Sequence, residues 1–546
     1  MNTHASGGGG PERRVATGLR QSARAASKTA LGRVEEDLLH AFSSGAMFPP
    51  GQAVAAHETH ASWVFVADER AYKIKKPVAL GFLDYTTLER RLAACREEVR
   101  VNAELAPGLY LGVRGISRAG DGYQFCAEDA PDAVEVAVEM VSFREQDTLA
   151  SVIEAGAVGQ ADVVAIARVL AAFHRNAMKV TGWSPDLVSG AWRRNVDELR
   201  AAGHPAGWDL DVAGAFGDAF VSAHAGEMRE RAREGLVRDG HGDLRCEHVL
   251  MRPSIRVIDR IEFDPGLRRI DVASDLAFLA MDLEARGQRP AARELVDAYK
   301  DAGMDAGPDS LRAFYAAHWA LVRAKVALLS AMEHAPRGDA ADVRWADHLW
   351  SLSELLCWRA RAPVALLICG PPASGKSTLA DELSRRSELP VVSSDQTRKR
   401  LAGIGPRDRA REEHYSESFS HATYSQVGRE AMRSLKSGRG VIVDATCRSR
   451  IDRGLMLKEL AAFTGPRVFV RLDIPPQVAV ERSKRRQDDP ERISDATPEI
   501  VRSQYTAFDA FDQSEGTPIV VDAVQPLENQ VAEVTGRVDQ LIAVRP

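Results

Sequence analysis

The sequence lacks a long apolar run, closely paired cysteines and any excess of positive charge. No apolar segment approaches the ~18 residues that cross a bilayer, and no apolar stretch follows the basic residues near the N-terminus. We therefore expect neither a membrane span nor a secretory signal. The six cysteines are scattered without a C-x-x-C pair, unlike a disulfide framework or a zinc site. These absences favour a cytoplasmic protein.

The charge is nearly balanced, with 71 basic and 77 acidic residues and a formal net charge of -6. Because there is no global positive field, a nucleic-acid partner and an anionic membrane are both disfavoured. The composition, 45% hydrophobic and 27% charged, is that of globular proteins and excludes a largely disordered chain. At 546 residues the chain is too long for one core, so we expect several domains.

Changes of composition along the chain predict two domains after a disordered tail. Residues 1–33 are rich in Gly, Ala, Ser and Arg and cannot offset the entropy of ordering. Residues 34–360 combine a β-rich small lobe, 34–145, with a helical lobe, 146–360, a division like that of a kinase. Residues 361–546 alternate strands and helices. The predicted fold class is multidomain, α+β and α/β, with a two-lobed domain followed by a doubly wound parallel sheet.

Local patterns place the elements that carry the motifs. Two short runs at 62–66 and 71–75, joined by a polar turn, predict a hairpin, and a helix at 87–105 and a strand at 134–140 follow. The apolar run at 364–369 is typical of a buried parallel strand. The helical and strand segments that alternate after it are 377–387, 391–394, 421–437, 440–443, 467–473, 476–486, 498–508 and 519–522.

The strongest motif joins that apolar run to the next helix and fits G-x-x-x-x-G-K-[ST] at full spacing. With the threonine that adjoins it, the motif consists of Gly370, Pro371, Pro372, Ala373, Ser374, Gly375, Lys376, Ser377 and Thr378. The glycines let backbone N–H groups close around a phosphate, and the helix N-terminus adds the positive end of its dipole. We expect Lys376 to reach the outer phosphates and the Ser377 hydroxyl to bind Mg²⁺.

Two acidic residues and a group of arginines are candidates for the chemistry at this phosphate site. Asp395 follows the strand at 391–394 and is either a general base or the cap of a helix that begins at Gln396. Asp444 ends G-V-I-V-D, which resembles a Walker B strand, so it is either close to Mg²⁺ or a turn residue. The arginines form either a lid on the transferring phosphoryl group or a solvated face. They are Arg482, Arg485, Arg486 and Arg492.

Residues 363–546 resemble the P-loop kinases of the polynucleotide-kinase, gluconate-kinase and zeta-toxin kind. The resemblance rests on G-P-P-A-S-G-K-S, S-S-D-Q-T-R-K-R and V-I-V-D-A-T. It implies transfer of a phosphoryl group from ATP to a hydroxyl, with Asp395 as the base. Arg398 and Lys399, one turn further on, either hold an anionic substrate or face water.

A second constellation lies in G-H-G-D-L-R-C-E-H at 240–248, followed by R-V-I-D ending at Asp259. An H-x-D loop and a second Asp at a strand end suit phosphotransfer, because Asp243 could accept a hydroxyl proton and Asp259 could bind Mg²⁺. The run I-D-V-A-S-D-L-A at 270–277 supplies the pair of acids and the helix start that follow this site in the aminoglycoside phosphotransferase family. Residues 34–358 therefore resemble an aminoglycoside/choline-type phosphotransferase.

The two halves together are similar to the proteins described as bifunctional aminoglycoside phosphotransferase/ATP-binding proteins. This resemblance implies that Asp243 is the catalytic base and Asp259 the metal ligand. It implies that Asp271 and Asp275 are scaffold residues, one capping a helix and the other buttressing the loop.

The same resemblance implies a strand lysine on the nucleotide phosphates. Lys75 takes that role and Glu98 is its partner, with Glu97 as the alternative. Lys73 points to the same face of a period-two strand, so the sequence leaves the choice between the lysines open. An exposed basic strand is the third interpretation.

Three departures from the family pattern concern activity more than fold. His248 stands where the family has a metal-binding Asn, and imidazole is a poorer ligand than an oxygen donor for Mg²⁺. Arg245 stands where His is common. No Gly-rich loop is present near 58–63.

The sequence thus predicts an ATP-dependent enzyme with two nucleotide-using modules and with ATP and Mg²⁺ as cofactors. It would transfer the γ-phosphoryl group to hydroxyls of small molecules that are sugar, aminoglycoside or gluconate-like. One alternative is a metabolite-sensing pseudokinase domain fused to an active P-loop NTPase or kinase. The other is a kinase that acts on a nucleic-acid 5′-hydroxyl.

Overall fold

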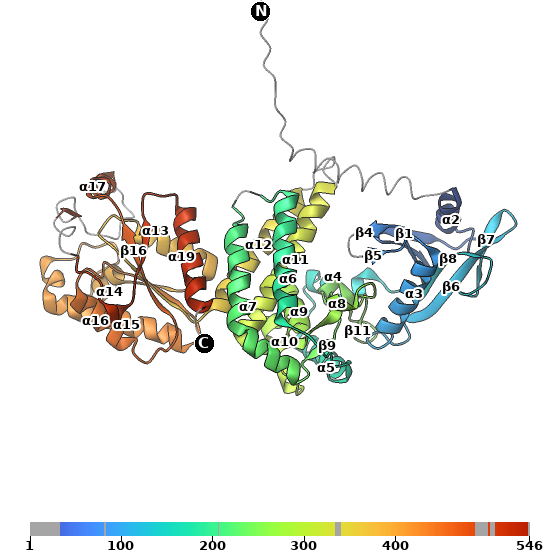
Figure 1. Ribbon diagram of the computed structural model, residues 1–546, viewed down its shortest axis with the longest axis horizontal. Helices are drawn as coiled ribbons and strands as arrows, with labels where there is room; N and C mark the ends of the chain where they lie inside the picture. Colours follow the sequence, from blue (N-terminus) through green and yellow to red (C-terminus); the bar gives the residue numbers. More distant parts are fainter. Residues whose placement is uncertain are drawn as a thin grey trace, which may run out of the picture. The chain divides into compact units, whose positions relative to one another are not determined.

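The computed structural model describes residues 33–80, 83–205, 207–333, 340–485, 501–502 and 508–543. The chain divides into two compact units, the first joining Met1–Trp183 to Arg229–Gly307 and the second joining Ser184–Met228 to Pro308–Pro546. Figure 1 labels the helices and strands of both. The predicted tail lies outside the described residues except for Arg33, which begins α2 (Arg33–Ser43). Among the described residues, no helix has both the length and the apolarity that a membrane crossing requires.

An antiparallel sheet of six strands, in the order β1-β2-β3-β8-β6-β7, opens the first unit. The strands are β1 (Val54–Glu58), β2 (Ser62–Ala67), β3 (Arg70–Lys75), β6 (Tyr110–Ala119), β7 (Gly122–Cys126) and β8 (Ala133–Val141). The predicted hairpin is confirmed as β2 and β3. Side chains alternate between the two faces, because Val136 and Val138 join a core with α3 (Leu88–Asn102), whereas Ala137 joins a core with α2.

The rest of the first unit is helical, with short strand pairs that carry its loops. Its elements are β4 (Ala79–Leu80), β5 (Leu83–Asp84), η1 (Glu145–Asp147), α4 (Leu149–Glu154), α5 (Gln160–Asn176), β9 (Val237–Asp239), η2 (Cys246–His248), β10 (Val249–Leu250), β11 (Arg256–Val257), α8 (Pro265–Arg268), β12 (Arg269–Asp271), α9 (Val272–Ala285) and α10 (Arg289–Asp301). Helices α5, α9 and α10 pack on one another around Leu170, Leu276 and Leu295, which are fully buried. This packing fixes the loop between β9 and η2, where Asp243 lies.

Four long helices belong wholly or mostly to the second unit: α6 (Pro185–Ala202), α7 (Leu210–Arg233), α11 (Asp309–Glu333) and α12 (Ala340–Arg361). Aromatic side chains fill their core. The Trp192 ring stacks on that of Phe314 with centroids 5.2 Å apart, and Phe314 stacks on Phe220 at 4.4 Å. The helices expected in one lobe at 146–360 are thus divided between the two units.

The second unit also contains a parallel sheet of five strands in the order β14-β15-β13-β16-β17. The strands are β13 (Ala365–Cys369), β14 (Val391–Ser393), β15 (Val441–Asp444), β16 (Arg467–Asp473) and β17 (Ile519–Asp522). The helical elements around them are α13 (Lys376–Ser387), α14 (Ser394–Leu401), η3 (Glu412–Tyr415), α15 (Glu417–Lys436), α16 (Arg450–Glu459), α17 (Pro476–Arg485), η4 (Gln513–Glu515) and α19 (Leu527–Ala543).

Helices cover both faces of this parallel sheet. Leu366 and Ile368 of β13 pack in a core with α13 and α19, and Leu367 packs in a second core with α15 and α16. The prediction of a doubly wound sheet is therefore confirmed. The chain runs from β13 to β14 on one side of β13, and later from β15 to β16 on the other side, which places a topological switch point at the carboxyl end of β13.

Candidate functional sites

The phosphate-loop motif lies at that switch point, between β13 and α13. Cys369 ends the strand and Lys376 begins the helix. The positive end of the helix dipole therefore lies at the loop, where a phosphate would bind. Gly375 precedes the helix with φ 101°, a conformation that side chains with a Cβ rarely adopt. The Lys376 ammonium lies over the loop and donates to the Pro371 carbonyl oxygen at 2.9 Å. This arrangement is that of an anion site built from backbone N–H groups.

Two hard oxygen donors meet beside the loop. Strand β15 pairs with β13 so that Asp444 stands opposite Ile368, at the carboxyl edge of the sheet. The Ser377 hydroxyl donates to Asp444 Oδ2 at 2.6 Å. Burial, and to a lesser extent the nearby Asp444, raise the pKa of Asp381. The donor set fits Mg²⁺, which prefers carboxylate and hydroxyl oxygens.

Asp395 lies at the same edge of the sheet. Ser393 at the end of β14 pairs in register with Asp444 of β15. The helix begins at Ser394, and the Ser393 hydroxyl caps it by accepting from the Gln396 N–H at 3.4 Å. The alternative that Asp395 is the cap is therefore wrong. Asp395 instead lies in the first turn of α14.

The basic residues predicted near this site have different surroundings. Arg398 and Lys399 are buried and do not face water, because they donate to the carbonyl oxygens of His414 and Pro406. Arg482 reaches the phosphate loop and donates to the Ser374 carbonyl at 3.4 Å and to the Ala523 carbonyl at 2.9 Å. Arg485 is exposed and pairs with Glu481 within its own helix. Arg486 and Arg492 lie outside the described residues.

In the first unit, one carboxylate holds both strand lysines. Glu98 of α3 accepts from Lys73 at 2.8 Å and from Lys75 at 2.6 Å. Lys75 is 1% exposed and its ammonium also donates to Glu262 at 2.5 Å. Lys73 is 18% exposed and reaches Asp259 at 3.1 Å. Lys73 is thus the lysine that faces the candidate metal ligand, and Lys75 is enclosed between two carboxylates.

The charges of this cluster support each other. Burial alone would lower the pKa of Lys73, but the carboxylates of Asp259 and Glu98 raise it well above its usual value. Burial would raise the pKa of Asp259, and Lys73 instead lowers it. Both groups are therefore charged at neutral pH. Glu97 takes no part in the cluster, because it pairs with Arg100 and Arg268.

The loop that carries Asp243 is supported from below by a buried carboxylate. Asp275 accepts from the backbone N–H groups of His241 at 2.5 Å and Gly242 at 2.9 Å, and its Oδ2 lies 3.2 Å from His174 Nε2. Gly242 has φ 86°, and a Cβ there would approach the Leu267 carbonyl to 2.9 Å. Asp271 caps α9. These contacts are the scaffold roles that the family resemblance implies for the two acids.

Arg245 and His248 occupy the space between Asp243 and Asp259. The Arg245 Nε donates to Asp243 Oδ1 at 3.0 Å, and its Nη2 lies 2.8 Å from His248 Nε2. Because a guanidinium only donates, Nε2 must accept, so Nδ1 carries the proton and donates to the Asp243 carbonyl oxygen at 2.8 Å. Both ring nitrogens are thus engaged. This geometry does not offer His248 to a metal, contrary to what its place in the sequence implies.

Sequence reasoning missed two members of this first cluster. Glu262, three residues after Asp259, binds Lys75, and Tyr110 accepts from the backbone N–H of Asp259 at 3.3 Å. The only signal in the sequence was the spacing of Glu262 from Asp259. Tyr110 comes from a strand whose pairing a local pattern does not specify.

The comparisons with known proteins agree with the phosphate-loop site. Residues 366–511 match the family described as "AAA domain". The chain is 35% identical over 410 residues to "Uncharacterized protein Rv2004c" of Mycobacterium tuberculosis (strain ATCC 25618 / H37Rv), which covers 72% of this chain and 78% of the relative. The protein "Mb2027c" of Mycobacterium bovis matches to the same extent. The chain belongs to the family of these mycobacterial proteins.

Solved structures resemble parts of the chain. A gluconokinase from Sinorhizobium meliloti 1021 is 20% identical and covers 33% of this chain and 93% of its own, with a TM-score of 0.25. A choline/ethanolamine kinase family protein from Mesorhizobium loti is 15% identical and covers 58% of this chain and 93% of its own, with a TM-score of 0.36. Likenesses at this level carry no conclusion about chemistry.

The two strand lysines are expected to differ in what they contribute. In a chain whose phosphate loop is disabled by Lys376→Ala, Lys73→Met should lower ATP affinity at the first unit at least tenfold and should destabilise the unit less than a change at Lys75 does, because Lys73 is partly exposed. Lys75→Met should instead destabilise the unit by about 3–5 kcal/mol, because two carboxylates lose their buried cation. Urea unfolding and calorimetric titration with ATP measure both effects. The opposite pattern would identify Lys75 as the nucleotide contact.

Proposed function

We propose that the second unit is an ATP-dependent phosphotransferase that acts on a hydroxyl of a small molecule. The observation that carries the proposal is the contact of Ser377 with Asp444 beside the phosphate loop. It joins a backbone anion site to an oxygen pair suited to Mg²⁺, the combination needed to hold a nucleotide triphosphate. The net charge of -6 favours a small acceptor over a nucleic acid.

The residues of this unit divide the work of phosphoryl transfer. The loop N–H groups and Lys376 hold the β- and γ-phosphates, and Arg482 stands at the Ser374 end of the loop, where it can neutralise charge on the transferred group. Asp395 accepts the proton of the acceptor hydroxyl. Mg²⁺, held by Ser377 and Asp444, would offset the negative charge of the phosphates. The strand register that aligns β14 with β15 puts these groups on one edge of the sheet.

Lys376→Ala should remove nucleotide turnover by the second unit without unfolding it, because the one hydrogen bond of the ammonium to the described residues goes to a loop carbonyl. We expect ATP affinity at this site to fall by at least tenfold, measured by titration of the full chain and by phosphate release. Lys436→Ala, an exposed lysine in the last turn of α15, is the matched control. Equal ATP affinity in both variants would refute the phosphate role of Lys376.

Asp395→Asn should slow phosphoryl transfer by ~10²-fold with little change in ATP affinity, as expected when a general base is lost. The diagnostic result is a slower transfer rate together with an unchanged ATP affinity. ATP titration measures the affinity, and the rate at saturating acceptor measures the transfer. If ATP affinity collapses and the saturated rate is unchanged, Asp395 has a structural role and the base lies elsewhere.

For the first unit we propose that it binds a nucleotide and transfers its phosphoryl group slowly at most. Such a unit is intermediate between an active phosphotransferase and a metabolite-sensing pseudokinase. Two observations favour this reading. Lys73 and Asp259 form a charged pair that suits a metal nucleotide. Asp243, the expected base, is ion-paired with Arg245, and His248 has no lone pair to give. Asp259 thus remains the single metal ligand among the sequence-predicted residues of this loop.

His248→Asn should supply the missing oxygen donor and free Arg245 from its imidazole contact. In the Lys376→Ala background we expect the Mg²⁺ concentration for half-maximal ATP binding to fall several-fold, because an amide oxygen is a better ligand than an engaged imidazole. Calorimetric titration across Mg²⁺ concentrations measures this change. His57→Asn, an exposed histidine of β1, should have no effect. If His248→Asn leaves the Mg²⁺ concentration for half-maximal ATP binding unchanged or raises it, the proposal that His248 replaces an oxygen ligand is contradicted.

A further inference from the structure

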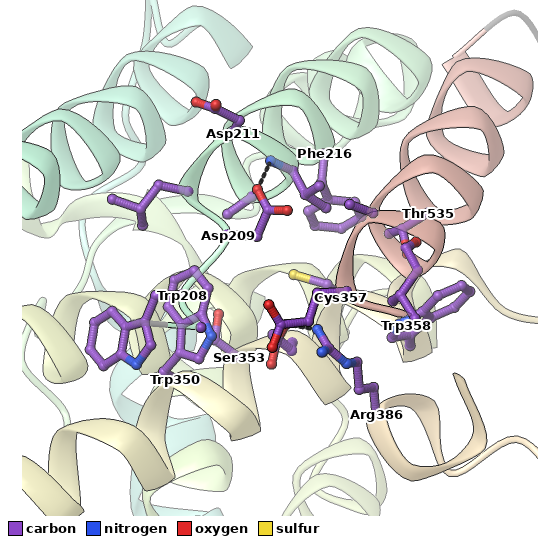
Figure 2. A pocket seen from close by; sticks show the side chains of 18 of the residues that line it. Trp208, Asp209, Asp211, Phe216, Trp350, Ser353, Cys357, Trp358, Arg386 and Thr535 are labelled. Carbon is purple, nitrogen blue, oxygen red and sulfur yellow. Dashed lines mark hydrogen bonds and ion pairs between the residues drawn. The ribbon is translucent and has the colours of Figure 1, made fainter. Parts of the chain in front are cut away.

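A cavity of about 440 Å³ lies within the second unit, apart from the phosphate loop. Its walls come from the start of α7, from α12, from the last turn of α13 and from α19 (Figure 2). The volume is in the range of pockets that bind small organic ligands, ~300–1,000 Å³. Nothing in the proposed phosphoryl transfer uses this cavity.

One wall is a pair of stacked indoles. The rings of Trp208 and Trp350 lie 4.7 Å apart between centroids with an angle of 6° between their planes. Trp208 Nε1 donates to Asp347 at 2.9 Å. Trp350 is only 4% exposed, yet its Nε1 has no hydrogen-bond partner among the described residues. Figure 2 shows Trp350 beside Ser353 at the cavity. A buried donor without a partner is costly, so this N–H calls for an acceptor from a ligand.

One turn further along α12, the carboxyl group of Glu354 also lines the cavity. Three arginines that line the cavity are already held by other carboxylates: Arg361 by Asp539, Arg386 by Glu382 and Arg200 by Asp211. Among the described residues, Glu354 accepts one long hydrogen bond, from Arg386 at 3.4 Å, and burial raises the pKa of Glu354. Its carboxyl group therefore calls for a hydrogen-bond donor, which an amine supplies.

We propose that this cavity is a binding site for a flat, amino-substituted heteroaromatic ring of the nucleobase kind. The indole pair offers an aromatic wall, the Trp350 N–H donates to a ring acceptor, and the Glu354 carboxyl group accepts from the exocyclic amine. A nucleobase carries both groups on one rigid plane. Few flexible bonds then have to be ordered on binding.

The site is separate from the phosphate loop, although α13 begins at the loop and lines the cavity with its last turn. Arg386 stands ten residues after Lys376 on this helix, which places the two about 15 Å apart along its axis. A nucleoside without phosphates would have no anion for the loop to hold. Adenosine is therefore a probe that favours the cavity over the phosphate loop.

The test is titration of the full chain, in the Lys376→Ala background, with adenosine and with inosine, which has an oxo group in place of the amine. We expect adenosine to bind, and ligand-observed NMR and calorimetry measure its binding. Trp350→Phe keeps a ring but removes the N–H, so affinity for adenosine should fall about fivefold to tenfold. Glu354→Gln should lower the preference for adenosine over inosine, because an amide donates as well as accepts.

Trp345→Phe is the matched control, because this residue lies on the same helix, α12, and does not line the cavity. It should leave adenosine affinity unchanged, and unchanged melting temperatures of all variants exclude a loss of fold. No adenosine binding at millimolar concentration would overturn the proposal. Binding that is equal in wild type, Trp350→Phe and Glu354→Gln would also overturn it and would assign adenosine to another site, such as the first unit.

Discussion

The register of three parallel strands is the constraint on which the candidate chemistry of the second unit depends. Ile368 of β13 stands opposite Asp444 of β15, which in turn stands opposite Ser393 of β14. The three strands therefore end together, and the residues that follow them, the phosphate loop and Asp395, emerge at one edge. A slip of one residue would turn Asp444 to the other face of the sheet and separate it from Ser377. Fully buried apolar side chains on both faces of β13 hold the register.

The first unit also brings charged side chains together, but strand register does not align them. Glu98 comes from a helix, the lysines from a strand of an antiparallel sheet, and Asp259 from a loop. Nothing in a ladder of backbone hydrogen bonds aligns them, so the side chains align one another through ion pairs. The cluster joins two lysines to three carboxylates, Glu98, Asp259 and Glu262, so one negative charge remains in excess. At its margin a further cation, Arg245, pairs with Asp243.

The sequence predicted what a contiguous motif encodes and missed what depends on distant partners. The phosphate loop, β13 and Asp444 were predictable because the spacing of glycines and the apolar run are local. The choice between Lys73 and Lys75 was not, because it rests on Glu262 and Asp259, which are nearly two hundred residues away. Helix α19 was missed although a helical spacing of buried apolar residues, Val531, Val534 and Val538, was there to be used.

The arginines show why basic residues near a phosphate site are poor evidence of substrate contact. Arg453 is fully buried; it pairs with Glu515 and donates to the carbonyl oxygens of Cys447, Asp509 and Ala510. It ties the loop after β15 to the segment before β17. A guanidinium suits this work because its five donors satisfy several carbonyl groups at once. Arg398 does the same for the turn near His414. Arginines such as Arg453 and Arg398 therefore stabilise the fold. Arg482 differs from them in its position, because it contacts the phosphate loop itself.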